Sequence, residues 1–526
     1  MSIAVDDRSR STPSDAPTPP DRPTDSPAGP WRAGRDARRA ALAAALSLAG
    51  GWGFVAGWWT PRGPVTTAEA ITSVVVSLGV GGLAGFLLKS RWAMLVTPVV
   101  FVAVVELVRM RVDGPMVDGI HPSFYGAIAL LTGRGFHALL TLLPMVLGAS
   151  LGAALARTRA PDPQPARRRS VRAFRRAGTG LLALCLLALT AALARPATTA
   201  PITGPDGHPL PGSVAELTTV EVDGHDLGLL IRGSDVDNPV LLFLAGGPGG
   251  SELGAMRRHL PELEEHFTVA TWDQRGSGTS YPELDPTDTV TLDGYVSDTI
   301  AVTEHLRRRF GADNIYLAGQ SWGTTLGVLA VQQRPDLYAA FVGSGQMVSQ
   351  RATDLIFYED TLAWASRTGD DGLRAELEAV GPPPYDEMFP YETALSHEQA
   401  VYPYDRTGNS EGSGQMSENL LVEEYTLIDQ VHILGAFMDT FAALYPQLQE
   451  IDFRESATEF AVPMYFVQGA HEARGRSEVF DEWYSMIEAP TKDLVVLETS
   501  GHRPLWEQPD RFVDYLVGTV LEQTRP

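Results

Sequence analysis

The fold is indicated most directly by residues 314–327, which read NIYLAGQSWGTTLG. A short apolar run typical of a β-strand ends in Gly-Gln-Ser-Trp-Gly, and an apolar run typical of a helix follows at once. Gly319 and Gly323 allow the backbone to turn sharply, so we expect the hydroxyl of Ser321 at the tip of a strand–turn–helix. The helix start behind it would present N–H groups to a developing negative charge. The stretch therefore predicts a nucleophilic serine.

Strand-like and helix-like runs alternate on both sides of this stretch. Strands are predicted at 217–222, 227–232, 239–245, 267–273, 314–319, 339–346, 463–468 and 494–498. Helices are predicted at 253–265, 291–310, 321–333 and 506–523. Such alternation indicates a mostly parallel sheet with helices on both faces. Residues 350–460 lack β-type alternation and are acidic and rich in Tyr and Pro, so we interpret them as an inserted helical cap.

A serine nucleophile needs a base to take its proton and an acid to orient that base. In a sheet of this type the expected order along the chain is serine, acid, histidine. His502 directly follows a strand-like run near the C-terminus, and we predict it as the base. The acid is expected in the loop after residues 463–468, where Glu472 is our prediction and Asp481 the next candidate. His471 also follows this strand, but it adjoins the expected acid.

A glycine-rich loop, residues 245–250, follows another predicted strand. Its glycines would allow close approach to a substrate oxygen, so we predict an oxyanion hole formed by the N–H groups of Gly247 and Trp322. The loop lacks the Gly-Lys-Ser/Thr of a phosphate-binding loop and the spacing of a dinucleotide site. The sequence implies no metal and no other cofactor. The only cysteine, Cys185, lies in an apolar run and offers the soluble part no thiol chemistry.

Three motifs occur in order along the chain: AGGPGG at 245–250, WDQRGSGTS at 272–280 and GQSWG at 319–323. They resemble the α/β-hydrolase superfamily, specifically its proline iminopeptidase-like branch, which has His-Gly-Gly-Pro-Gly, Asp-Gln-Arg-Gly-Ser-Gly and Gly-Gly-Ser-Trp-Gly. The resemblance covers about residues 215–350 and 460–520. It implies an α/β-hydrolase fold and hydrolysis of an amide or ester through an acyl-enzyme. Two positions depart from the branch, since Ala245 replaces its histidine and Glu472 replaces the usual aspartate.

The resemblance extends loosely to the predicted cap. Cap glutamates of the branch bind the free N-terminal amine of the substrate, and residues 421–425, LVEEY, resemble its Arg-Ile-Glu-Asn-His-Tyr. Glu423 and Glu424 are therefore implied as substrate-binding residues, with a solvated helix face as the alternative. We interpret Asp273 and Arg275 as structural.

The expected activity is an N-terminal aminopeptidase acting on a small-molecule or short-peptide substrate. A carboxylesterase or lipase-type hydrolase is one alternative. A non-catalytic sensor module that retains the fold is another, motivated by Ala245 and Glu472.

The charged residues divide the chain into two unlike parts. The first 200 residues carry 22 of the 41 Lys and Arg and 11 of the 64 Asp and Glu, which leaves 19 basic and 53 acidic residues for the rest. A basic, apolar part followed by a strongly acidic part indicates a membrane region joined to a soluble domain. So acidic a domain is not expected to bind nucleic acid.

Five apolar runs lie at about residues 40–59, 69–88, 92–109, 136–156 and 178–194. Each is about long enough to cross a hydrocarbon core of ~30 Å, so we expect about five transmembrane helices in the lipid bilayer. Basic residues gather before the first run, between the second and third, and before the fifth. This pattern places the N-terminus in the cytoplasm and the acidic domain outside the cell membrane, whereas an even number of spans would reverse it. A transporter with an appended enzyme is disfavoured by the sparse charge within the runs.

These inferences divide the chain into six segments. We expect a disordered tail at 1–36, a multi-pass transmembrane region at 37–195, a linker at 196–213, the first part of the α/β core at 214–349, the helical cap at 350–460 and the second part of the core at 461–526.

Overall fold

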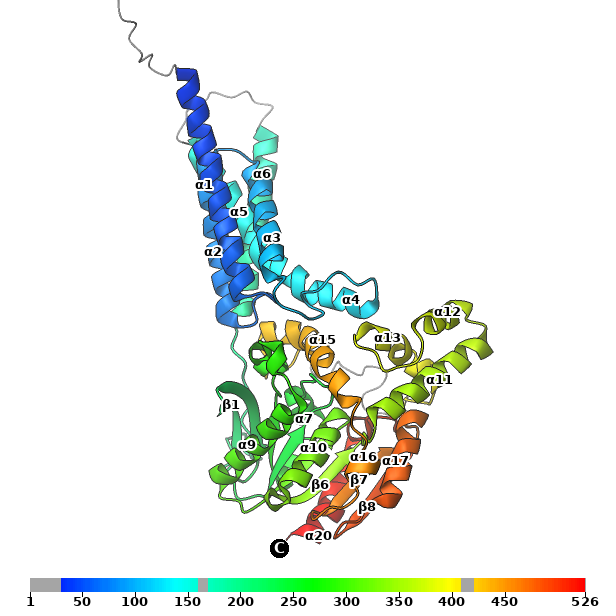
Figure 1. Cartoon of the computed structure of the whole chain (residues 1–526). Helices are drawn as coiled ribbons and strands as arrows, with labels where there is room; N and C mark the ends of the chain where they lie inside the picture. The colour runs from blue at the N-terminus through cyan, green and yellow to red at the C-terminus, as the bar shows by residue number, and fades with distance from the viewer. Residues whose placement is uncertain (1–29, 159–168, 408–420, 526) are drawn as a thin grey trace, which may run out of the picture.

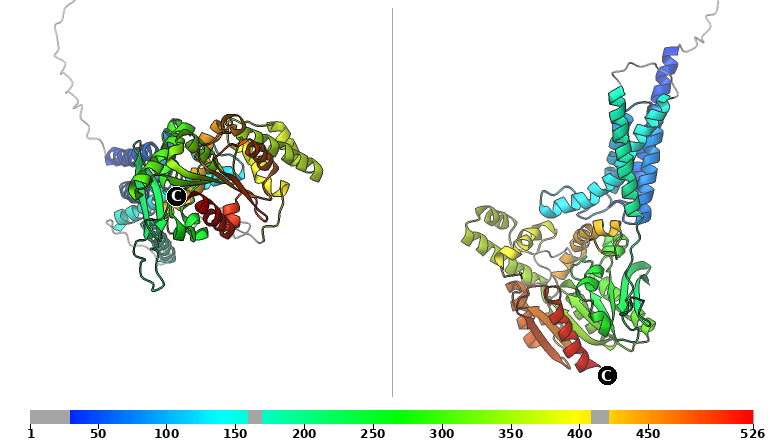
Figure 2. Two further views of the ribbon diagram at one scale, coloured as in Figure 1. Left: turned by 90° about the horizontal axis from the view of Figure 1, so that it is seen from below. Right: turned by 180° about the vertical axis from the view of Figure 1, so that it is seen from behind.

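The computed structural model describes residues 30–158, 169–407 and 421–525. They form a bundle of long helices standing on an α/β part (Figures 1 and 2). The first helix, α1 (Pro30–Trp59), begins within the predicted tail of residues 1–36, so residues 30–36 are helical. The rest of that predicted tail lies outside the described residues.

The α/β part contains one mixed sheet of eight strands in the order β1-β2-β4-β3-β5-β6-β7-β8. The strands are β1 (Val214–Val222), β2 (His225–Gly233), β3 (Val240–Leu244), β4 (Thr268–Trp272), β5 (Ile315–Gln320), β6 (Tyr338–Ser344), β7 (Met464–Gly469) and β8 (Lys492–Leu497). β2 pairs antiparallel with β1 and β4, whereas the remaining neighbours are parallel. Each of the eight predicted strands is present, and their parallel carboxyl ends meet at one edge.

Helices cover both faces of this sheet, because the buried central strands are apolar on both sides. In β3, Leu242 and Leu244 join one buried cluster, whereas Leu241 and Phe243 join the other. The first cluster includes residues of α9 (Leu292–Phe310), α10 (Trp322–Gln333) and α17 (Arg474–Met486). The second includes residues of α7 (Leu253–His259), α8 (Leu263–His266), α18 (Pro504–Glu507), α19 (Pro509–Tyr515) and the π-helical η7 (Leu516–Leu521). The chain ends after α20 (Glu522–Thr524).

Two helical predictions differ from the structure. The predicted helix at 253–265 is interrupted after His259 by Leu260 and Pro261, because proline lacks the N–H that a continuing helix needs. Helix α17 is absent from the predicted helices, although Val479, Phe480 and Trp483 are spaced as one buried helical face.

The described residues of the segment predicted as the cap, 350–407 and 421–460, are largely helical. They contain α11 (Gln350–Thr368), α12 (Asp371–Val380), α13 (Phe389–Ser396), α14 (Glu398–Val401), α15 (Leu427–Leu448) and α16 (Phe453–Ser456). Thr426 and Asp429 form a capping box that starts α15. Thr440 of α15 donates to the carbonyl of Gly276 over 2.7 Å, which fixes this helix on the core.

The bundle consists of α1, α2 (Thr67–Leu88), α3 (Ala93–Arg109), α5 (Phe136–Thr158) and α6 (Arg169–Leu193). A shorter helix, α4 (Phe124–Ala129), leads through the π-helical η1 (Leu130–Gly135) into α5. Glycines bring α2 and α5 into backbone contact, since a Cβ on Gly152 would lie 2.0 Å from the carbonyl oxygen of Gly82. Close packing through small residues is typical of helices in membranes.

By length and composition, five described segments could cross a membrane: Arg35–Trp59, Thr67–Leu88, Phe124–Arg157, Arg176–Leu193 and Leu427–Leu448. The first four correspond to predicted apolar runs. The predicted run at 92–109 forms α3, which has 17 residues and is not among the five. The fifth segment is α15, whose buried residues share one cluster with the sheet and another with the bundle.

The foot of the bundle is fastened to α15 by one buried arginine. Arg62, in the loop between α1 and α2, donates to Asp439 of α15 over 2.6 Å and to Asp285 over 3.0 Å. Tyr281 also donates to Asp439, over 2.8 Å. His432 of α15 hydrogen-bonds the carbonyl of Pro64 through Nε2 at 2.8 Å. These contacts join two parts of the chain that lie about 370 residues apart.

Candidate active site

Ser321 occupies a sharp turn between β5 and α10. Its φ of 51° lies in the left-handed region, which is costly for a residue with a side chain. Both flanking glycines are required sterically: a Cβ on Gly319 would lie 2.5 Å from the carbonyl oxygen of Gly323, and one on Gly323 would lie 2.1 Å from that of Leu244. The motif at 319–323 therefore forms the predicted turn, with Ser321 at its tip.

The structure brings Ser321, His502 and Glu472 together in one hydrogen-bonded chain. His502, in the loop after β8, places Nε2 2.8 Å from Ser321 Oγ. Its Nδ1 lies 2.6 Å from Oε2 of Glu472, in the loop after β7. These distances are those of a nucleophile, its base and an orienting acid. The Ser–His separation lies within hydrogen-bond reach, so the geometry gives no reason to favour a non-catalytic module.

The other two candidates lie elsewhere. His471 stacks on Tyr404 at a ring-centroid distance of 4.9 Å. Asp481 lies on the exposed side of α17. The geometry thus joins the predicted base, His502, and the predicted acid, Glu472, to the serine.

Glu472 is a buried carboxylate held from both sides. Its Oε1 accepts hydrogen bonds from the Ala473 N–H over 2.8 Å and from Arg476 Nε over 2.7 Å. Burial by itself would raise the pKa of Glu472, but the charges and hydrogen bonds of Arg476 and His502 outweigh it and lower this pKa to about 2. The carboxylate therefore stays ionised beside His502 at neutral pH.

Arg476 connects this carboxylate to the cap. Its Nη2 donates to Glu398 of α14, and its guanidinium lies 4.8 Å from the ring centroid of Phe357 of α11. The arginine side chain and Glu472 are both buried, whereas the side chain of Glu398 is 30% exposed. Arg476 is not among the predicted site residues, although its position four residues after Glu472 is the spacing of a helical ion pair.

The glycine-rich loop lies directly against the turn that carries Ser321. A Cβ on Gly246 would lie 2.2 Å from the side-chain oxygen of Gln320, so the two segments are in close contact there. Gly247 has a φ of 143°, which favours glycine. Trp322 is the first residue of α10, so its N–H is one of the groups that a helix leaves unpaired. The two predicted oxyanion donors thus sit on adjoining segments.

Gln274 joins these two segments. Its Oε1 accepts from the indole N–H of Trp322 over 2.7 Å, and its Nε2 donates to the carbonyl of Ala245 over 3.2 Å. Gln274 is buried and belongs to the motif at 272–280. Gln274 is not among the predicted site residues, although its neighbours Asp273 and Arg275 were interpreted as structural.

Asp273 and Arg275 make structural contacts, as interpreted from the sequence. Asp273 accepts from the N–H and hydroxyl of Thr279 and from the hydroxyl of Tyr425. Arg275 donates to Asp298 over 2.9 Å. Burial raises the pKa of Asp273 to about 7.

The two predicted substrate-binding glutamates lie beside an arginine. Arg257 of α7 donates to both oxygens of Glu424, whose side chain is fully buried. Glu423 is about one-third exposed, and its Oε1 lies 4.0 Å from Arg257 Nη2. The described contacts of Glu424 are thus with a protein cation, whereas Glu423 retains access to solvent.

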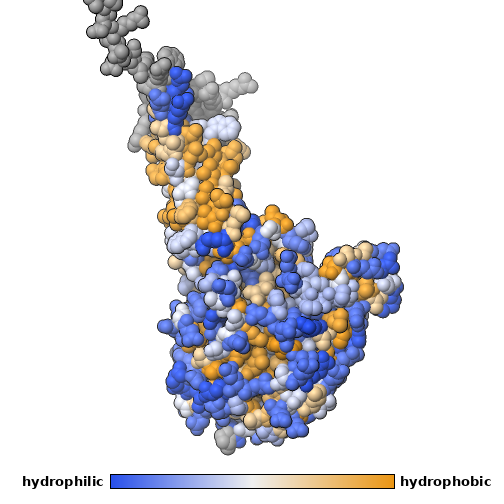
Figure 3. All heavy atoms as spheres, in the orientation of Figure 1, coloured by the Kyte–Doolittle hydropathy of each residue, from blue (hydrophilic) through white to orange (hydrophobic). Residues whose placement is uncertain are grey.

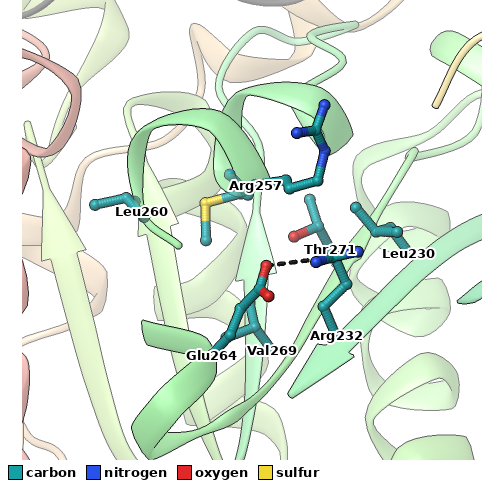
Figure 4. A pocket seen from close by; sticks show the side chains of 8 residues that line it. Leu230, Arg232, Arg257, Leu260, Glu264, Val269 and Thr271 are labelled. Atoms are coloured by element: carbon teal, nitrogen blue, oxygen red, sulfur yellow. Dashed lines mark hydrogen bonds and ion pairs between the residues drawn. The ribbon is translucent and has the colours of Figure 1, made fainter. Parts of the chain in front are cut away.

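Two cavities lie outside the Ser–His–Glu chain. A small cavity of about 10 Å³ lies beside the ion pair between Arg232 and Glu264, with Arg257 turned away from that pair (Figure 4). Such a volume suits at most one water molecule. A cleft of about 620 Å³ opens between the foot of the bundle and residues 281–288. Neither cavity is lined by Ser321, His502 or Glu472.

A serine turn, a following histidine loop and a facing glycine loop at the carboxyl edge of such a sheet define the α/β hydrolases. The sequence model of the alpha/beta hydrolase fold matches residues 239–378, and the chain belongs to this family. The probable aminopeptidase YbaC of Bacillus subtilis (strain 168) is 30% identical over 307 residues, which cover 58% of this chain and 96% of that protein.

Two further similarities were found, one to a protein sequence and one to a solved structure. The probable proline iminopeptidase of Leptolyngbya boryana is 31% identical over 149 residues, which cover 28% of this chain and 43% of that protein. Among solved structures, a proline iminopeptidase-related protein of Thermus thermophilus is 22% identical with a TM-score of 0.42, over 59% of this chain and 98% of that one. The chain is thus an α/β hydrolase with aminopeptidase and proline iminopeptidase homologues at modest identity.

Proposed function

We propose that the chain is a membrane-anchored serine hydrolase that cleaves an amide or ester through an acyl-enzyme. The observation that carries this proposal is the hydrogen-bonded chain from Ser321 through His502 to Glu472. An N-terminal aminopeptidase is the activity that we favour, because YbaC, similar over 96% of its length, is described as a probable aminopeptidase.

In the proposed reaction, His502 Nε2 takes the proton of Ser321 Oγ as this oxygen attacks the acyl carbon. Glu472 accepts a hydrogen bond from His502 Nδ1 and stabilises the positive charge of the imidazolium. The N–H groups of Trp322 and Gly247 stabilise the oxyanion. His502 then returns the proton to the leaving amine or alcohol, and water hydrolyses the acyl-enzyme by the same steps.

The mechanism is tested with a fluorophosphonate probe, which reacts with activated serines. Wild-type protein should be labelled and Ser321→Ala should not. Ser485→Ala is the matched control, because Ser485 is an exposed serine on α17 outside the proposed site. Equal labelling of the wild type and Ser321→Ala would exclude Ser321 as the nucleophile.

An esterase is the second candidate activity, and one contact favours it. Arg257 neutralises Glu424, so this carboxylate offers less attraction to a substrate ammonium than a free one would. Glu423 is the carboxylate that we propose for amine recognition if the enzyme is a peptidase.

We also propose that the bundle crosses the membrane, with the N-terminus in the cytoplasm and the hydrolase outside. The surface of the bundle is apolar between its two ends (Figure 3). α1 begins at the end far from the hydrolase, and the α2–α3 connection with Lys89 and Arg91 lies at that end too (Figure 1). Basic residues at the far end support a cytoplasmic location for it.

The topology is tested by adding protease to intact cells that express the chain with an N-terminal epitope. The hydrolase should be digested while the epitope stays protected. If the hydrolase is protected and the N-terminal epitope is digested, the proposed orientation is wrong and the hydrolase lies in the cytoplasm.

A further inference from the structure

An apolar stripe runs along one side of α4 and η1. Phe124 and Leu131 are 69% and 67% exposed, and Ala127 between them is exposed as well. The spacing of three and four residues places them on one side of a helix. Leu139 extends this side into α5 of the bundle and is also exposed. We call Phe124, Ala127, Leu131 and Leu139 the α4 stripe.

The opposite side of α4 is packed on the hydrolase. Gly126 and Ala129 are buried, and the N–H of Tyr125 donates to Glu392 of α13 over 3.0 Å. The ring of His121, just before α4, stacks on Phe389 at a centroid distance of 4.1 Å. Figure 1 shows α4 projecting sideways from the foot of the bundle, between the bundle and the cap. The stripe therefore faces away from the protein.

The length of this helical segment leaves the stripe at the edge of the bilayer. Phe124–Arg157 contains 34 residues, whereas about 20 residues are enough to span a hydrocarbon core. α5 alone supplies 23 residues, so α4 and η1 are not needed for the span. A row of exposed large apolar side chains, unlike a single one, indicates a covered surface.

We propose that the α4 stripe inserts into the interfacial region of the outer leaflet, so that α4 clamps the cap against the membrane surface. This inference rests on the proposed membrane anchoring of the bundle. Its occupant is the bilayer, because the stripe is continuous through Leu139 with the apolar surface of the bundle. An amphipathic helix lying in the interface places its apolar face about 5–10 Å into the boundary between headgroups and acyl chains.

The chain offers a clean experiment because its only cysteine is Cys185. In a Cys185→Ala background, spin labels are placed at Phe124→Cys and Leu131→Cys. Leu184→Cys on α6 is the control for the bundle surface, and Ala375→Cys on α12 is the control for water. All four positions are exposed, and fluorophosphonate labelling verifies that each variant retains its site.

The full-length protein is reconstituted in liposomes, and the accessibility of each label to oxygen and to a water-soluble nickel chelate is measured. We expect labels at 124 and 131 to favour oxygen over nickel, as at 184, whereas 375 favours nickel. Nickel-accessible labels at 124 and 131 with an oxygen-accessible 184 would overturn the role of α4 and leave the anchoring intact.

Two other results would also overturn the inference. If the label at position 184 is also accessible to nickel, the proposed membrane anchoring of the bundle is itself contradicted. Labels at 124 and 131 that are shielded from both reagents and broadened by spin–spin coupling would identify a second copy of the chain as the occupant instead.

Discussion

Arg476 and His502 bind the two oxygens of one carboxylate, with Arg476 Nε 2.7 Å from Oε1 of Glu472 and His502 Nδ1 2.6 Å from Oε2. Neither oxygen can turn away without breaking a charged hydrogen bond, so the imidazole is held in one orientation. Because Arg476 also contacts Glu398 and Phe357, the seating of the cap and the orientation of the acid depend on the same side chain.

Replacing Arg476 should therefore slow the reaction more than it weakens substrate binding. For Arg476→Gln we expect kcat to fall by about tenfold or more, equivalent to ~1.4 kcal/mol, with a smaller change in KM. Arg476→Lys should recover only part of this loss, because an ammonium lacks the planar fork that reaches both Glu472 and Glu398.

Arg474→Gln is the matched control for Arg476→Gln. Arg474 lies two residues earlier and also pairs with the cap, through Asp360, but it has no contact with Glu472 among the described residues. An equal loss of kcat in both variants would mean that cap seating alone, and not the carboxylate, is affected.

The lowered pKa of Glu472 predicts a loss of stability in acid. Since the pKa in the folded protein is about 2 and the ordinary value is 4.5, this group contributes stability above about pH 4.5 and loses it as pH falls towards 2. The contribution is on the order of 3 kcal/mol. The free energy of unfolding is measured in detergent by guanidinium titration, followed by tryptophan fluorescence. Between pH 5 and 3 it should fall more steeply for the wild type than for Glu472→Gln. An equal dependence of the free energy of unfolding on pH in both proteins would contradict the lowered pKa of Glu472.

Replacing Gln274 should disturb the position of the glycine-rich loop at residues 245–250. Gln274→Met keeps the approximate volume but removes the hydrogen bonds to Trp322 and Ala245. Each lost bond leaves a buried polar group unpaired at a cost of about 1–3 kcal/mol, so we expect lower thermal stability and a lower kcat. Gln332→Met, on the partly exposed end of α10, is the control. Unchanged kcat in Gln274→Met would show that the loop holds its position without this residue.

The cap glutamates distinguish a peptidase from an esterase. If Glu423 binds a substrate ammonium, Glu423→Gln should lower kcat/KM on a proline arylamide by at least about a hundredfold and spare a neutral short-chain ester. Glu424→Gln should instead impair both substrates, because it leaves Arg257 without its buried partner. Activity on both substrates that is untouched by Glu423→Gln would favour the esterase.

The sequence predicts the eight strands and the chain order Ser321, Glu472, His502 because these depend on local patterns. Apolar runs define the strands, and the glycines at 319 and 323 are visible as a motif. Gln274 and Arg476 could not be assigned from the sequence, because their roles depend on partners in other elements: Gln274 meets Ala245 and Trp322, and Arg476 meets the cap. The pairing of Glu424 with Arg257 is equally invisible, since 167 residues separate them.

The assignment of apolar helices also depends on contacts that the sequence does not reveal. The apolar composition of residues 427–448 matches that of a membrane helix, yet more than half of this segment is buried inside the protein, where α15 packs against η3 (Gly278–Leu284), α4 and η1. Hydropathy measures how apolar a helix is and does not report whether lipid or protein covers it.

The buried ion pair between Arg62 and Asp439 limits which helical segments could replace the bundle. Asp439 lies in the interior of the hydrolase, but its cation comes from the loop after the first helix of the bundle. A hydrolase that began at residue 196 would keep this aspartate without its arginine, and removing one partner of a buried ion pair costs about 3–5 kcal/mol. The bundle and the hydrolase are therefore not interchangeable modules: a different helical segment could replace this bundle only if it also supplied the missing positive charge.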